Sequence, residues 1–113
     1  MANLPTVDLI ILSELKDIME ESFSEIMIEF RDEIPSYKNS MTDFLTDAEK
    51  LSILTHTIKS SSANLGFVRL SENCRKIEEG LRIDATMKVD SLVDECKNEL
   101  DMVYLEIEKI LAS

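Results

Sequence analysis

Residues 51–66 read LSILTHTIKSSSANLG and have the periodicity of one amphipathic helix. An α-helix turns by about 100° per residue, so side chains that recur three or four apart share one sector. The predicted buried sector comprises Leu51, Leu54, Thr55, Ile58, Ser61, Ser62 and Leu65. The helix should stop at Gly66, because glycine adopts the left-handed conformation that closes a helix. Upstream, residues 46–49 (TDAE) have the pattern of a capping box with Thr46 as the cap, which predicts a start near Asp47.

Amphipathic patterns also cover the sequence on either side of this helix. Apolar residues recur three or four apart from Val7 to Ile34, which predicts one long helix or two short ones, with a small N-terminal helix before about Glu20 as one option. Pro35 lacks a backbone donor and is expected to force a kink or a restart. Downstream, helices are predicted from about Val68 to Arg82 and from about Thr86 to Leu111.

The connections between these predicted helices are short, which favours antiparallel neighbours. The expected fold is therefore an all-α, up-and-down bundle. A mass of 12.9 kDa fits one domain, residues 1–113. Cys74 and Cys96 each fall on an apolar helical stripe, so reduced, buried thiols are expected in preference to a disulfide or a metal pair.

The charge of the chain excludes some classes of partner. With 12 lysines and arginines against 23 aspartates and glutamates, the formal net charge is −11. Such a chain is not expected to bind nucleic acid or an anionic membrane, because both need clustered cations. No apolar run has the length of a membrane span, and Asp8 precedes the first apolar stretch where a signal peptide would have basic residues. We expect a cytoplasmic protein, and a bundle of this size can be monomeric.

His56 is the only histidine in the chain, and helical phase places it away from the predicted buried sector. It lies about 160° from the centre of that sector, so its imidazole should point to solvent. Lys59 lies about 60° to one side of it, one turn away. The expected exposed neighbours of His56, called here the His56 face, are Glu49, Ser52, Ile53, Ser60 and Ala63. A lone histidine on such a face can also be an ordinary surface residue.

Three features of the His56 face point to chemistry there. The small side chains of Ser52, Ser60 and Ala63 would let a partner approach closely. Ile53 is an apolar residue outside the buried sector, as an interface would require. Lys59 supplies a positive charge suited to a phosphoryl group, and a neutral imidazole keeps one ring nitrogen free as a nucleophile.

The string from His56 to Gly66, with Lys59 three residues after the histidine, resembles the signature of histidine-containing phosphotransfer (HPt) domains. Residues 70–78 (LSENCRKIE) resemble the helix that follows it in that family. The resemblance implies an all-α fold, an antiparallel up-and-down four-helix bundle with an additional short N-terminal helix. It implies that His56 accepts a phosphoryl group and that Lys59 stabilises it. It also implies partners, namely receiver domains of a hybrid sensor histidine kinase and of response regulators, with Mg²⁺ bound by the receiver. The family usually has glycine where this chain has Ser60.

Alternative functions follow from the same residues. Without a glycine-rich phosphate loop, the chain is expected to be a phosphocarrier with no ATP site of its own and no cofactor. A second hypothesis is a non-catalytic helical adaptor that binds a partner through Ile53 and Ala63. A metal site is not expected, because no second histidine stands four residues from His56. Ser60 as a nucleophile would have no visible base other than His56.

Overall fold

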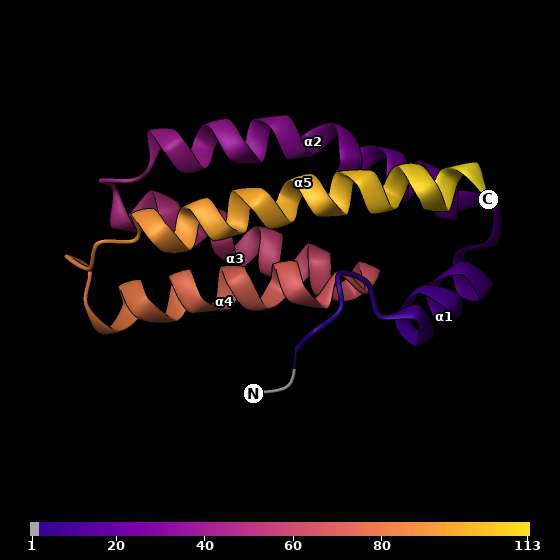
Figure 1. The fold of residues 1–113 in the computed structure, drawn as a ribbon, viewed down its shortest axis with the longest axis horizontal. Coiled ribbons are helices and arrows are strands. Elements are labelled where there is room, and N and C mark those ends of the chain that lie inside the picture. The colour runs from indigo at the N-terminus through magenta and orange to yellow at the C-terminus, as the bar shows by residue number, and fades with distance from the viewer. Residues whose placement is uncertain (1–2) are drawn as a thin grey trace.

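Four long helices form an antiparallel up-and-down bundle in the computed structural model, which describes residues 3–113 (Figure 1). Residues 1 and 2 of the predicted domain lie outside the described residues. Contacts join α2 to α3, α3 to α4, α4 to α5 and α5 to α2, so α3 and α5 occupy opposite corners of the bundle. The elements are α1 (Leu9–Met19), the 3₁₀ turn η1 (Glu20–Ser22), α2 (Phe23–Asp43), α3 (Ala48–Leu65), α4 (Val68–Ile83) and α5 (Asp90–Ala112). The predicted fold class is confirmed.

The core lies between the four long helices and draws on the apolar stripe of each. Met27, Ile58, Ile77 and Val103, one from each of α2 to α5, have no exposed surface. Burying side chains of this size stabilises the fold by about 1.5–3 kcal/mol each relative to exposure. The packing of all four stripes against one another therefore holds the bundle together.

Cys74 of α4 and Cys96 of α5 meet inside this core. Both are free and buried, and their Sγ atoms lie 3.6 Å apart, well beyond the length of a disulfide bond. The hydrogen bond to Cys96, together with burial, raises the pKa of the Cys74 thiol above its ordinary value. The prediction of buried thiols on apolar stripes is confirmed.

The N-terminal segment resolves into two helices. Glu20 has a φ of 50°, which L-residues rarely adopt, and the short η1 turn separates α1 from α2 at this point. Of the two options, two helices with a break at Glu20 is the one observed. A kink or a restart was predicted at Pro35; α2 runs through this residue, so the helix does not restart there. Pro35 is exposed, and water can satisfy the carbonyl that its missing N–H leaves free.

The cap of α3 and the start of α5 differ from the sequence prediction. Thr46 does not cap α3; the Asp47 carboxylate accepts from the backbone N–H of Lys50, 3.1 Å away, and the helix begins one residue after it. The last helix begins at Asp90 and not near Thr86. Near Thr86, the Asp84 carboxylate accepts hydrogen bonds from both the N–H and the hydroxyl of Thr86. These bonds form a turn where the first helical turn was predicted.

Gly66 ends α3 and fixes the direction of the next helix. Its φ of 89° is left-handed, and the N–H of Phe67 donates to the carbonyl of Ser62 at 2.8 Å, as in a Schellman motif. The Gly66 carbonyl accepts from the N–H of Asp8 at 2.7 Å, so α1 begins against this end of α3. A Cβ at position 66 would lie 3.2 Å from the Asp8 carbonyl oxygen. Both the conformation and the close approach therefore require glycine.

Candidate functional site

His56 lies near the middle of α3 on the side that faces solvent, and 63% of its side chain is exposed. The opposite side of α3 is the buried one, where the hydroxyls of Thr55 and Ser62 donate to the carbonyls one turn earlier. The buried residues of α3 are Leu51, Thr55, Ile58, Ser62 and Leu65. Leu54 and Ser61, also predicted for this sector, lie at its edges and are half-buried. The helical phase inferred from the sequence places His56 correctly.

The His56 face is open around the imidazole. Glu49, Ile53, Ser60 and Ala63 are exposed, and Ser52 is half-buried. Ile53 has 62% of its surface exposed, although it is a large apolar residue. The small side chains one turn on either side of His56 leave its ring accessible to another protein.

Glu78 of α4 joins His56 to Lys59. One carboxylate oxygen of Glu78 lies 2.7 Å from Nδ1 of His56, and the other accepts a hydrogen bond from Nζ of Lys59. The side chains of Lys59 and Glu78 are 27% and 24% exposed, so the carboxylate bridge is half-buried beneath the exposed ring. The structure therefore brings His56 and Lys59 together through a third residue.

The contact with Glu78 determines which nitrogen of the neutral imidazole carries hydrogen. An ionised carboxylate has no hydrogen to donate, so Nδ1 of His56 must donate to Glu78. The Nε2 atom of the neutral ring then carries the free lone pair. This nitrogen is the one available to act as a nucleophile.

The charges around Glu78 keep its carboxylate ionised. The hydrogen bond from Lys59, with a smaller contribution from His56, holds the pKa of the Glu78 carboxyl below its ordinary value, against the opposing effect of partial burial. An ionised Glu78 keeps its acceptor function toward Nδ1 at neutral pH. It also stabilises positive charge on the imidazole when that charge develops.

Glu78 was not among the site residues predicted from the sequence. The two-residue connection at Gly66 and Phe67 makes α3 and α4 antiparallel neighbours, which places His56, ten residues before Gly66, opposite Ile77, ten residues after Phe67. Glu78 follows Ile77 directly. The register of this helical hairpin was the signal that could have identified it.

Residues 3–113 contain no group of three or more histidine, cysteine, aspartate or glutamate side chains that could hold a metal ion. Within the same residues, no helix has the length and apolar character needed to cross a membrane.

Comparison with known proteins agrees with this geometry. A family model described as "Hpt domain" matches residues 25–104, which include His56, Lys59 and Glu78. The crystal structure of histidine-containing phosphotransfer protein B (HptB) from Pseudomonas aeruginosa PAO1 is similar, with a TM-score of 0.87 and 24% sequence identity over 95% of each chain. At that identity the likeness concerns the fold. No curated protein matches the chain by sequence.

Proposed function

The chain belongs to the Hpt domain family and is a histidine phosphotransfer protein of a multistep phosphorelay, and we propose that His56 is its phosphoacceptor. The observation that carries this assignment is the bond of Nδ1 to Glu78, which leaves Nε2 free on an exposed ring. His56 is the only histidine in the chain, so no other imidazole competes for the role.

The transfer step uses the lone pair on Nε2. This nitrogen attacks the phosphorus of an aspartyl phosphate on a receiver domain, and the bond between phosphorus and the aspartate oxygen breaks with its electron pair on the carboxylate. The new bond joins Nε2 to phosphorus, and the ring becomes positively charged while Nδ1 keeps its hydrogen bond to Glu78. The negative carboxylate stabilises that charge as it forms. The reverse step passes the phosphoryl group to the aspartate of a second receiver.

Lys59 is the residue that we assign to the phosphoryl group. It stands one turn after His56 and shares the Glu78 carboxylate with it, so its ammonium lies beside the ring. A lysine on a flexible stem can rotate from Glu78 toward phosphoryl oxygens. Glu78 would then serve as the resting partner that keeps Lys59 near the site.

The receiver supplies the remaining parts of the reaction in this proposal. It brings the phosphorylated aspartate and the Mg²⁺ ion, and this chain acts as a carrier without an ATP site. Ile53, Ser60 and Ala63 are accessible around the ring and form the surface that the receiver would contact. A rigid helix that presents one positioned nucleophile reduces the entropy lost on reaching the transition state.

A two-step transfer experiment tests the carrier role. The chain is incubated with a phosphorylated receiver domain, purified away from it, and then mixed with a second receiver in the absence of ATP. We expect phosphate to move onto the chain and then onto the second receiver. A chain that binds receivers but never carries phosphate would instead have the adaptor function.

A further inference from the structure

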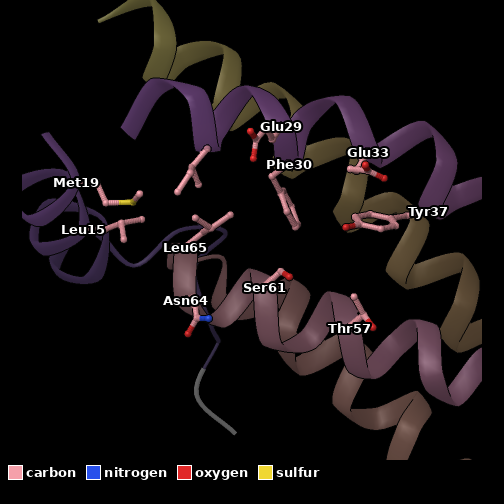
Figure 2. Close-up of a pocket in the computed structure, with 11 residues that line it drawn as sticks. Leu15, Met19, Glu29, Phe30, Glu33, Tyr37, Thr57, Ser61, Asn64 and Leu65 are labelled. Atoms are coloured by element: carbon pink, nitrogen blue, oxygen red, sulfur yellow. The ribbon is translucent and has the colours of Figure 1, made fainter. Parts of the chain in front are cut away.

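A groove of about 710 Å³ runs between α2 and α3 and is closed at one end by α1 (Figure 2). Figure 2 shows Phe30 and Tyr37 directed from α2 into this space. The apolar lining, called here the groove floor, comprises Leu15, Met19, Ile26, Phe30 and Leu65. Leu15, Met19 and Ile26 are half-buried, whereas Phe30 and Leu65 are buried core residues that form the bottom of the groove. Another apolar surface can pack against such a floor.

Two carboxylates line the α2 side of the groove. Glu29 and Glu33 stand one turn apart, both are exposed, and neither has a cation within ion-pair distance in residues 3–113. The cations of α2 are engaged elsewhere, because Arg31 binds Glu108 and Lys38 binds Asp101, both on α5. The groove therefore has an apolar floor beside two like charges that repel each other.

The α3 side of the groove is continuous with the His56 face. Thr57, which directly follows His56, lines the groove together with Ser61 and Asn64, and none of the three is charged. Ile53 is exposed one turn before Thr57 and extends the accessible apolar surface toward the ring. A protein that docks over His56 can therefore also cover the groove.

We propose that Glu29 and Glu33 select the receiver domains with which this chain exchanges phosphate, by pairing with lysine or arginine side chains beside an apolar receiver surface that packs on the groove floor. The inference rests on the proposed function, since it assigns partner choice at the same face. A basic residue in this position would relieve the repulsion between Glu29 and Glu33. An acidic receiver surface would meet two unneutralised carboxylates, in a chain whose net charge of −11 already repels it.

The test compares two double variants with the same change in charge. Glu29→Gln/Glu33→Gln removes the two groove carboxylates. Asp94→Asn/Glu95→Gln removes two exposed carboxylates on α5, the helix diagonally opposite α3. Rate constants for phosphoryl transfer are measured at low and at physiological salt, with a panel of phosphorylated receiver domains from the source organism.

For the receiver that is fastest with the wild-type chain, we expect the groove variant to transfer about tenfold more slowly at low salt, with a weaker dependence on salt. The rate constants of the α5 variant should stay close to those of wild type. The differences in rate constant between receivers should become smaller only in the groove variant. Equal rates in the two double variants would overturn the selection by Glu29 and Glu33 while leaving the phosphorelay function intact. If no receiver phosphorylates the wild-type chain, the proposed function itself fails, and this inference fails with it. Melting curves of both variants verify that they fold.

Discussion

Nδ1 of His56 lies 2.7 Å from Oε2 of Glu78, a residue 22 positions later on the neighbouring helix. The same carboxylate binds Lys59 through its other oxygen. Glu78 therefore orients the imidazole, selects the tautomer with a free Nε2, and holds the lysine beside it. Its role is positional, because it acts on the reacting nitrogen only through the ring.

Removal of Glu78 should slow phosphoryl transfer without unfolding the bundle. We expect Glu78→Ala to reduce the rate by about tenfold, because a hydrogen bond to a charged group contributes about 1.5 kcal/mol. Glu78→Gln keeps an acceptor for Nδ1 but loses the charge, so its rate should fall between those of the alanine variant and wild type. The transfer rate is measured at several pH values, since loss of the carboxylate should change both the pH dependence of the rate and the maximum rate.

Glu79→Ala is the matched control for this series. Glu79 is adjacent to Glu78, but its carboxylate binds Arg82 on the same helix and does not contact His56. Its transfer rate and pH profile should match those of wild type. If Glu78→Ala matched wild type as well, Glu78 would have no part in positioning the ring.

The charge on Glu78 also predicts how stability depends on pH. Its pKa is lower in the folded chain than its ordinary value of 4.5, mainly because of Lys59, so the folded state favours the ionised form. The resulting stabilisation is fully present above pH 4.5 and is lost as the pH falls through the lower pKa of the folded state. Glu78→Gln should have a lower free energy of unfolding than wild type at pH 7. The difference in free energy between the two proteins should become smaller below pH 4.5. Urea unfolding at several pH values measures this, and a constant difference would contradict it.

Lys59→Ala should leave the fold intact and slow transfer. The ion pair with Glu78 is only partly buried and contributes about 0–1 kcal/mol, so the melting temperature should change little. Transfer should fall by roughly threefold to tenfold, because one charge contact to the phosphoryl group is lost. Lys50→Ala, in the first turn of the same helix, serves as the control. Equal rates in the two variants would remove Lys59 from the site.

Ser60 stands where the family usually has glycine, and it is exposed on the His56 face. Ser60→Gly should keep the wild-type rate and lose about 0.5 kcal/mol of stability, because glycine is the weaker helix former. Ser60→Leu should slow transfer about tenfold by holding the receiver away from the ring. Ser91→Leu, on α5, is the control for added bulk. A wild-type rate for Ser60→Leu would show that close approach at position 60 is not needed.

The position of His56 could be predicted from sequence because it depends on one helix alone. The spacing of Leu51, Ile58 and Leu65 determines which side of α3 is buried, and the exposed side then follows. The end of α3 at Gly66 is equally local, since a left-handed residue closes the helix there. The sequence left the break at Glu20 as one of two options, because a glutamate with a positive φ carries no such signal.

The partner of His56 depends on how two helices pack, which no single helix determines. α4 carries three carboxylates in Glu72, Glu78 and Glu79, and only the rotation of α4 against α3 decides which one reaches the imidazole. Glu72 and Glu79 instead bind arginines of their own helix. The groove beside Glu29 and Glu33 likewise exists only once α1, α2 and α3 are assembled.

The measurement that tests the central claim most directly is the location of the phosphoryl group. Wild type and His56→Gln are incubated with the same phosphorylated receiver, and the phosphate is mapped by mass spectrometry under neutral conditions. Both proteins should give the same helical circular dichroism spectrum, because His56 is exposed and contributes little to the core. We expect acid-labile, base-stable phosphate on His56 of the wild type and none on the variant. Phosphate retained by His56→Gln, or acid-stable phosphate on a serine such as Ser60, would contradict the assignment.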